Sequence, residues 1–560
     1  MRYVDIVDNL KVRLGYGLAG NQGGISSYTT MNLAKPNGVT PVDNLPMVTF
    51  ETLRNVNPNL KWEVKKTFNA GADLEMYGSR LILSVNYYKS KTCDMLYNYH
   101  VSVPPFTSLG GFWQGLYLHD WGTNNNSVLA TWEYLYKSVM LCNESVRRIR
   151  DYAAKHSDDD TRPLMAEVKV LRGLFYYHLM DLFGRVPLIK ENGVEKSSKE
   201  QAERSETFWF IVNELQEALP YLADERSNVP GEYYGRVTLH VAYFLLAKLA
   251  LNAEVYTDDV WTDGLRPNGA DIEFTIDGAK KNAWETTIYY CDKIADAGYD
   301  LEPDYRTNFA VFNESSVENI FVIPMDKTLY TNQFIYLFRS RHYNHAKAYG
   351  LGGENGASAT LDVLETFGYG TENEDPRFEF CYFDDALTDL DGNPIMLDDG
   401  KTRLVYEPWK VALDVSGKPY EKTAGARMKK YEVDPTGFKD GKLIDNDIVL
   451  YRYADVLLMK CEAKVRNGEN GDYELSLVRS RVNAPARSAT LENILDERML
   501  ELAWEGWRRQ DMIRFGVYTE AYSSRPQLEN ENTGFTTVFP IPEKIIQMNN
   551  GILQNSGYKK

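Results

Sequence analysis

Three glutamates near the C-terminal end of the chain have a spacing that could support acid–base chemistry. Glu497, Glu501 and Glu505 recur every four residues, so a helix would place them on one face. Carboxylates cleave glycosidic bonds when they face each other across a sugar, about 5 to 9.5 Å apart, which neighbours on one helix do not. We therefore predict an ion-pair ladder rather than catalysis. Its cations would be arginines three or four residues from acids: Arg498, Arg508, Arg509 and Arg514.

Two other motifs could hold a metal or a cofactor. His342 and His345 stand three apart in RHYNH, but no carboxylate at metal-ligand spacing follows, so packing or hydrogen bonding is the preferred interpretation. The stretch Gly15–Gly20, GYGLAG, matches the dinucleotide fingerprint, but the Asn21–Gly24 segment that follows cannot open a helix. We predict a Gly-rich strand end and loop there, and no cofactor or metal anywhere.

Composition narrows the class of ligand. The 560 residues carry a formal net charge of −17 and no basic run, which excludes a nucleic-acid partner. The 38 Tyr and 10 Trp are either packing residues or a surface that stacks on ring-shaped ligands. The five Cys are an odd number without a Cys-x-x-Cys pair, so each is predicted to be a small buried apolar residue. No signal-peptide core or membrane-spanning stretch is found.

The elements that must position these residues are mainly helices. The stretch Ala166–Leu188 predicts a helix with two apolar stripes, covered by helices on both sides and ending at Gly184. One stripe is Leu164, Val168, Leu171, Phe175 and Leu179, and the other is Val170, Leu174 and Tyr177. Amphipathic spacing predicts further helices at Val128–Tyr152, Glu206–Leu222, Thr238–Tyr256, Trp284–Ala297, from Tyr451 onward and at Ile494–Gly516. Such lengths favour a tetratricopeptide-like stack of helix pairs.

Two segments depart from that helical pattern. Glu318–Ile323 is predicted to be a strand, and the Pro-rich tail from Val538 is predicted to be extended and docked on the body. The first hundred residues alternate with a period of two, which predicts long strands at Leu10–Leu18, Val64–Glu75 and Leu81–Tyr87. Strands of that length with one apolar face are typical of an outer-membrane barrel, the alternative being a soluble sandwich.

The strand region resembles the late barrel region of SusC-type TonB-dependent receptors. The matching stretches are VRLGYGLAGNQG, NPNLKWEVKKTFNAGADLEMYGSRLILSVNYYKSKTCDMLYNY and VSVPPF, and they cover about residues 1–106. A handful of strands cannot close a barrel, so this piece is not expected to transport anything.

The remainder, about residues 107–560, resembles the SusD/RagB family of surface glycan-binding lipoproteins. The matching stretches are TWEYLYKSVMLCN, AEVKVLRGLFYYHLMDLFGRVPL, YRTNFAVFNESSVENIFVIP, EDPRFEF, YRYADVLLMKCEAK, DERMLELAWEGWRRQDMIRFG and FPIPEKIIQMNNGILQNSGY. The resemblance implies a mainly α SusD-like fold of tetratricopeptide-like helix pairs with an irregular, loop-rich face that binds oligosaccharide or polysaccharide. It implies no catalysis, a SusC-type TonB-dependent transporter as partner, and a place on the surface of the outer membrane.

The chain also departs from that family. It has neither the lipoprotein signal nor the acylated Cys, and the family's opening helix is replaced by the receptor-like strands. Membrane association would then run through the partner or a lost lipid anchor. We hypothesise a fusion of two adjacent genes, by in-frame deletion or assembly error, which sequencing across the codons for Val103–Trp113 would test.

Three functions follow as hypotheses: a non-catalytic glycan-binding module delivering to a transporter, a glycoside hydrolase, or a helical scaffold that binds only protein. For the first, loop aromatics would stack on sugar rings while amides bond the hydroxyls. The candidate ligand-binding residues are Trp113, Trp121, Asn124, Tyr343, Tyr349 and Asn355.

Overall fold

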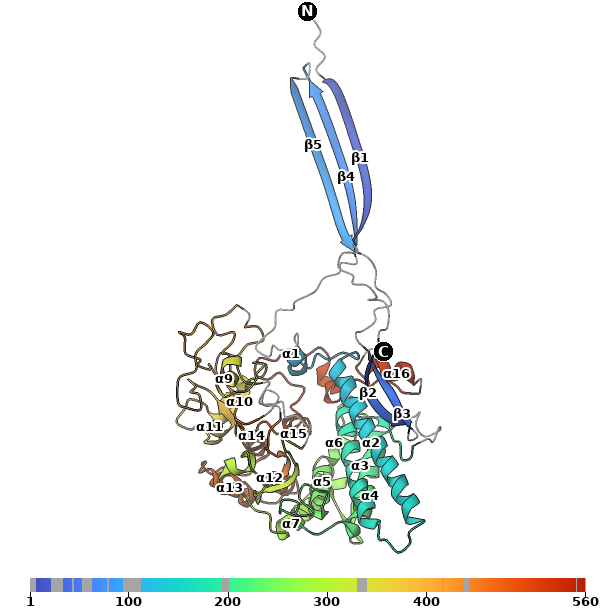
Figure 1. Ribbon diagram of the computed structural model, residues 1–560, viewed down its shortest axis with the longest axis vertical. Coiled ribbons are helices and arrows are strands. Elements are labelled where there is room, and N and C mark those ends of the chain that lie inside the picture. Colours follow the sequence, from blue (N-terminus) through green and yellow to red (C-terminus); the bar gives the residue numbers. More distant parts are fainter. Residues whose placement is uncertain are drawn as a thin grey trace, which may run out of the picture. The chain divides into compact units, whose positions relative to one another are not determined.

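The chain folds into two compact units, Met1–Val101 and Ser102–Lys560. The computed structural model in Figure 1 describes residues 7–21, 34–42, 45–52, 63–77, 80–93, 112–192, 201–329, 340–415, 417–437, 443–549 and 551–558. Within these residues, no helix combines the length and the apolar character needed to cross a membrane.

The first unit is built on a sheet of three long antiparallel strands. These are β1 (Val7–Asn21), β4 (Glu63–Met76) and β5 (Leu81–Cys93), in the order β1-β4-β5. A separate pair joins β2 (Ala34–Val42) to β3 (Leu45–Thr52). The three strands expected from period-two alternation are confirmed, and the GYGLAG motif lies within β1.

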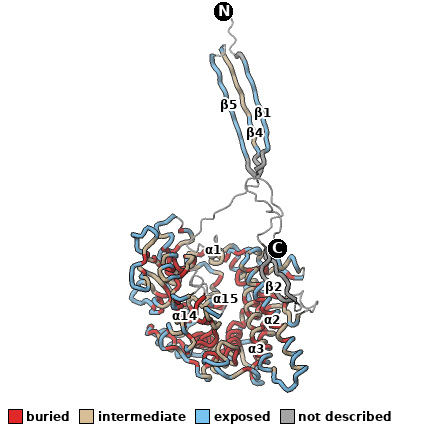
Figure 2. Tube along the Cα trace, in the orientation of Figure 1, coloured by how far each residue is buried: buried red, intermediate tan, exposed pale blue. Residues whose placement is uncertain are grey.

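The two faces of this sheet differ in chemistry. The register sets Leu14 of β1 opposite Ala70 of β4, and Ala70 opposite Tyr87 of β5, so apolar side chains share one face. On the other face, Arg13 and Ser84 each donate to Asp73 at 2.8 Å. The strands β1 and β5 are exposed and β4 is intermediate (Figure 2). The apolar face is itself exposed, since Leu14 is 74% and Tyr87 59% exposed.

The second unit is mainly helical. Both α2 (Asn126–Ala153) and α4 (Arg204–Ala218) pack against α3 (Arg162–Phe183), as expected for a helix gripped on two sides. The next helices, α5 (Leu239–Leu251) and α7 (Ala283–Asp296), pack on each other, and α7 contacts α12 (Tyr453–Arg466). The helix α12 in turn contacts α13 (Asp472–Arg481) and α14 (Leu491–Leu502), and α14 contacts α15 (Arg508–Phe515).

Shorter elements connect these helices. The short helices are α1 (Phe112–Tyr117), α6 (Ala253–Tyr256), α9 (Tyr343–Ala348), α10 (Leu361–Phe367), α11 (Arg377–Cys381) and α16 (Glu543–Met548). The single-turn 3-10 helices are Leu219–Tyr221, Gly269–Asp271, Tyr305–Phe309, Glu531–Thr533 and Phe535–Thr537. The paired short strands are β6 (Val186–Pro187) with β7 (Gln201–Ala202), β8 (Phe274–Ile276) with β9 (Ala279–Lys281), β10 (Asn319–Ile323) with β13 (Ile448–Arg452), and β11 (Tyr382–Phe383) with β12 (Arg427–Met428).

The helix α3 ends where the sequence predicts, and its two predicted stripes are confirmed only in part. Gly184 caps it with φ 67°. Leu164, placed in the first predicted stripe, is 53% exposed. Of the predicted positions, Val170, Tyr177 and Leu179 are buried, and Leu171, Leu174 and Phe175 are partly buried against the core. The other buried positions were not predicted: Ala166, Gly173, Tyr176, Met180 and Phe183, with the polar Arg172 and Asp181. Gly173 matters here, because a Cβ at this position would lie 2.4 Å from Leu215 of α4.

Three predicted boundaries were wrong. The helix expected at Thr238–Tyr256 breaks at Asn252, and the one expected at Ile494–Gly516 divides into α14 and α15. Tyr451, which was expected to open a helix, lies within the strand β13. The predicted strand at Glu318–Ile323 is confirmed as β10.

The C-terminal tail docks on the helical body as predicted. The Phe539 backbone NH donates to Leu182 O at 2.7 Å, and Asn555 Nδ2 donates to Phe183 O at 2.9 Å. The tail is not fully extended, because it contains α16.

Candidate functional site

A cavity of about 460 Å³ lies between α1, α10, α14 and α15. Many of its lining residues carry rings, which makes it suited to flat or ring-shaped ligands. The lining rings are Tyr117, His119, Trp121, Tyr382, Trp504, Tyr518, Tyr522 and Phe539. Arg498, Arg508, Arg509 and Asp362 also border it. We refer to it below as the aromatic cavity.

Trp121 is fixed in the wall of this cavity. Its side chain is 5% exposed, and its Nε1 donates to the Tyr558 hydroxyl at 2.7 Å. The ring of Phe539 meets it edge-on, with centroids 4.6 Å apart. The C-terminal tail therefore sets the orientation of Trp121.

Trp504 is a cavity residue that sequence reasoning missed. It lies between α14 and α15 with φ 65°, a left-handed conformation that is costly for a bulky residue. Its buried Nε1 has no acceptor among the described residues. The stretch AWEGW shows the tryptophan, but the break in the helix that turns it toward the cavity cannot be seen in a pattern that continues from Ile494 to Gly516.

His119 contacts other residues of the wall of the aromatic cavity that contains Trp121. Its Nδ1 lies 2.6 Å from Glu531 Oε1, its Nε2 lies 3.2 Å from the Tyr522 hydroxyl, and its ring stacks on Tyr518 with centroids 4.2 Å apart. Burial lowers the pKa of His119 to about 4, although Glu531 opposes that shift. The ring is therefore neutral near pH 7 and serves to hold Tyr518 and Tyr522 in place.

The other predicted ligand residues lie in two groups. Trp113 belongs to α1, but its side chain is outside the described ones, and Asn124 is exposed just before α2. Tyr343 opens α9 and is 50% exposed, and Tyr349 follows α9 and donates to Thr388 O at 3.2 Å. Asn355, 8% exposed, donates to Lys422 O at 3.0 Å. Among the described residues, no hydrogen bond or ring contact joins the two groups, and their role stays a prediction.

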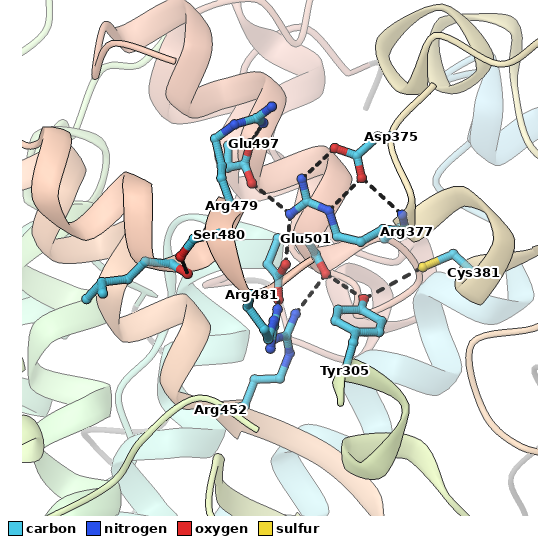
Figure 3. A network of polar contacts seen from close by, with 12 residues as sticks. Tyr305, Asp375, Arg377, Cys381, Arg452, Arg479, Ser480, Arg481, Glu497 and Glu501 are labelled. Carbon is cyan, nitrogen blue, oxygen red and sulfur yellow. Dashed lines mark hydrogen bonds and ion pairs between the residues drawn. The ribbon is translucent and has the colours of Figure 1, made fainter. Parts of the chain in front are cut away.

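The glutamates that opened the sequence analysis lie buried in a network of charges. Figure 3 shows Glu497 and Glu501 on α14, with guanidinium groups converging on them. Arg377 Nη1 donates to Glu497 at 2.7 Å and to Glu501 at 2.8 Å. Burial alone would raise the pKa of Glu501, but the guanidinium groups of Arg481, Arg452 and Arg377 hold it well below its usual range.

The predicted ion pairs are therefore present, but with different partners. The cations around Glu497, Glu501 and Glu505 are Arg377, Arg452, Arg479, Arg481 and Lys430, all from other elements. Among the arginines expected to pair along the helix, Arg514 does so with Asp511, three residues before it, and it also pairs with Glu462. Arg498 pairs with Asp455 and Asp511, Arg509 pairs with Asp181, and Arg508 donates to Leu495 O. The rest of the prediction was wrong because spacing along one helix cannot show which buried charges tertiary packing brings together.

The two histidines and the cysteines are packing residues in this structure. His345 Nδ1 lies 3.1 Å from the Tyr406 hydroxyl, and burial lowers the pKa of His342 to about 4. In the described part of the chain, no group of three or more His, Cys, Asp or Glu is arranged to hold a metal ion. Four cysteines are free and buried, as predicted: Cys142, Cys291, Cys381 and Cys461. The side chain of Cys93 is outside the described ones.

Two family models match this chain in separate ranges. The model of the SusD family matches residues 318–558, and the model described as "Starch-binding associating with outer membrane" matches residues 80–251. The second match begins at residue 80, directly before β5, and so includes part of the strand unit.

Individual proteins resemble this chain in two ways, most as SusD-like proteins and some as TonB-dependent receptors. The starch-binding protein SusD of Bacteroides thetaiotaomicron is 26% identical over 438 residues, 72% of this chain and 74% of that protein. A solved laminarin binding SusD-like protein superposes with a TM-score of 0.60 at 22% identity, covering 82% of this chain and 92% of the other. TonB-dependent receptor P3 of Formosa agariphila is 41% identical over 88 residues, 16% of this chain and 8% of the receptor. Over most of its length, the chain is therefore SusD-like in sequence and in fold.

Proposed function

We propose that this protein binds oligosaccharide or polysaccharide without cleaving it, at the outer-membrane surface, and delivers it to a TonB-dependent transporter. The proposal rests on the SusD-like match together with one observation, the aromatic cavity of the helical unit. The proteins that this chain resembles include a starch-binding protein and a laminarin binding protein.

The chemistry of the cavity suits a sugar. Sugar rings have apolar faces that stack on Trp and Tyr, while their hydroxyls need a few well-placed polar partners. Trp504 offers both, since its ring borders the cavity and its Nε1 lacks a protein acceptor in the described part of the chain. Arg508 and Asp362 border the same space and can bond hydroxyl groups.

Hydrolysis is the weaker candidate. A glycosidase needs two carboxyl groups across the scissile bond. Among the described residues that line the aromatic cavity, Asp362 is the single carboxylate. The buried Glu497 and Glu501 are fully engaged by arginines.

The strand unit supports the transporter part of the proposal. We infer that residues 1–106 are a fragment of a SusC-type receptor barrel joined to a SusD-like domain of tetratricopeptide-like helix pairs spanning residues 107–560. The matches to TonB-dependent receptors, each covering 15% or less of the receptor, favour this origin. Source DNA with two intact reading frames at the codons for Val103–Trp113 would refute the fusion.

A glycan array followed by calorimetry tests the binding function. Once a ligand is found, Trp504→Ala should lower the affinity about tenfold or more, because a stacking ring and an indole donor are lost together. Trp409→Ala is the matched control, since Trp409 is 49% exposed and is not among the residues lining the cavity.

Each alternative has its own outcome. Release of reducing ends from a polysaccharide panel would favour a hydrolase, and capture of a receptor barrel with no glycan bound would favour a protein-binding scaffold. Equal loss in both tryptophan variants would remove the aromatic cavity from the site. Trp121→Ala tests the sequence-based candidate separately, with helical circular dichroism as the check on folding.

A further inference from the structure

A second cavity, of about 270 Å³, lies in the helical unit beside the start of α4. Its walls come from the first residue of α4, the loop from Asp258 to Arg266, and the segment from Ile513 to Thr537. It shares Tyr518 with the aromatic cavity, but its other walls are mostly polar. We refer to it as the Arg204 cavity.

The loop that forms one wall is held firmly. Asp259 accepts hydrogen bonds from the Ser205 backbone NH at 2.8 Å and from its hydroxyl at 2.7 Å, which ties the loop to α4. Trp261 packs so closely that a Cβ on Gly184 would lie 2.7 Å from its ring and one on Gly534 would lie 2.6 Å from its carbonyl oxygen. The cavity is therefore a formed feature of the fold.

Arg204 is the unusual group in this cavity. It is 1% exposed, and its Nε and Nη2 have no acceptor among the described residues. Its guanidinium lies near the rings of Tyr256 and Trp261, 5.2 and 5.7 Å from their centroids. Ring contacts stabilise a cation but do not satisfy its N–H groups, and a buried donor without a partner is costly.

The two unpartnered nitrogens form one edge of the guanidinium. Elsewhere in this chain that edge binds both oxygens of a carboxylate. Arg514 Nε and Nη2 donate to the two oxygens of Glu462 at 2.7 and 2.8 Å. Arg377 binds Asp375 through the same atoms, at 2.8 Å each. A buried edge of this kind is a geometric match for a carboxylate.

An unpartnered edge is not unique to Arg204. Arg341 and Arg427 also have Nε and Nη2 without acceptors in the described part of the chain. What distinguishes Arg204 is that it lines a cavity, and that a second buried donor without an acceptor among the described residues, Trp261 Nε1, belongs to another lining residue of the same cavity.

The charges around the cavity favour an anion. Arg204 and Arg266 both line it, and Asp258 is the single carboxylate among its described lining residues. Burial raises the pKa of Asp258, and the two guanidinium groups outnumber this one carboxylate. Arg266 donates to the backbone carbonyls of Ile513 and Arg514, at 3.1 and 3.0 Å, which leaves its positive charge uncompensated by those bonds.

We propose that the Arg204 cavity binds a carboxylate, held by the Nε and Nη2 edge of Arg204 and by the indole NH of Trp261. Its volume is at the low end of ligand sites, on the order of 300 Å³, so the carboxylate belongs to a small molecule or to one sugar-acid residue. The side chains of Thr519, Asn532 and Thr533 border the cavity and supply further polar contacts. This site does not depend on the glycan proposal for the aromatic cavity.

Calorimetric titration of the full chain with sodium acetate, sodium glucuronate and glucose tests the proposal. The carboxylates should bind and glucose should not. Equal affinity for acetate and glucuronate assigns the site to a free carboxylate, whereas a clear preference for glucuronate assigns it to a sugar acid. Absence of carboxylate binding to the wild-type chain would overturn the proposal.

Variants separate the site from general charge effects. Arg204→Lys keeps the charge but loses the two-nitrogen edge, so carboxylate affinity should fall about tenfold to hundredfold. Trp261→Phe keeps the ring, removes the indole donor and should lower affinity by a smaller factor. Arg162→Lys is the control, because the same edge of Arg162 is already bound to Asp160 at the surface. Unchanged affinity in both Arg204→Lys and Trp261→Phe, each shown to be folded by circular dichroism, would also refute the site.

Discussion

The two units of this molecule differ in which side chains they expose: apolar side chains are exposed in the first, and charged side chains are buried in the second. In the strand unit, Leu14 and Val85 are 74% and 58% exposed on one face of the sheet. In the helical unit, Arg377, Glu497 and Glu501 are fully buried. The first arrangement is expected of a surface made to be covered by something apolar, and the second of buried charges that neutralise one another.

Residue type alone therefore does not decide which side chains are buried in the two units. Glu501 is buried because guanidinium groups from three other elements reach its carboxylate. The apolar face of the sheet stays exposed because, within the strand unit, no described element packs on it. This contrast predicts opposite responses to substitution in the two units.

The largest effect is expected at Glu501. Glu501→Gln removes the negative charge between Arg377, Arg452 and Arg481 and leaves buried cations uncompensated, which should lower the free energy of unfolding by about 3–5 kcal/mol. Denaturant unfolding followed by helical circular dichroism measures it. Glu217→Gln, whose carboxylate pairs with Lys169 at the surface, should leave stability almost unchanged. A small change at Glu501 would mean that the network is not a stabilising centre.

An acid-sensitive effect of somewhat smaller size is expected at Glu462. Burial would raise its pKa, but Arg514 and Arg466 lower it to about 2 from 4.5. Because the folded-state pKa is depressed, this group stabilises the fold fully above pH 4.5, and the contribution of roughly 3 kcal/mol is lost as the pH falls toward 2. Unfolding curves across that window measure the loss. In Glu462→Gln, the free energy of unfolding should depend less steeply on pH between 4.5 and 2. An unchanged dependence on pH would contradict the assignment.

The smallest effect on stability is expected on the exposed face of the sheet. Leu14→Lys and Val85→Lys replace exposed apolar groups, so the strand signal and the unfolding midpoint should change little. Binding of a hydrophobic dye should fall, because a contiguous apolar patch is interrupted. Lys11→Thr, on the polar face, is the control. Dye binding that stays at the wild-type level would show that the face is already covered.

The sequence was sufficient to predict the strands, in which apolar and polar residues alternate along the chain. The strands β1, β4 and β5 have one apolar and one polar face, so a period of two was enough to find them. The helix α3 was found with its end, but it is buried on so broad a surface that its apolar stripes could not show which positions face inward.

The site was harder to predict than the elements. Trp121 was selected from its loop and does border the aromatic cavity. Trp504 was missed because its place depends on a break between α14 and α15 that continuous helical spacing conceals. Whether the aromatics of α9 share a ligand with this cavity is a prediction that only binding measurements can decide.

By itself, the sequence determined the two kinds of secondary structure in this chain, the strands of the first unit and the amphipathic helices of the second. It could do so because hydrophobic periodicity is a local property. Tertiary structure alone decided which arginines neutralise Glu497 and Glu501 and which rings line the aromatic cavity. It also decided that the Nε and Nη2 edge of Arg204 has no acceptor among the described residues. The physical reason is that buried charges and rings pair across separate elements, from Arg481 with Glu501, 20 positions apart, to Arg377 with Glu497, 120 positions apart, and no local pattern records such pairs.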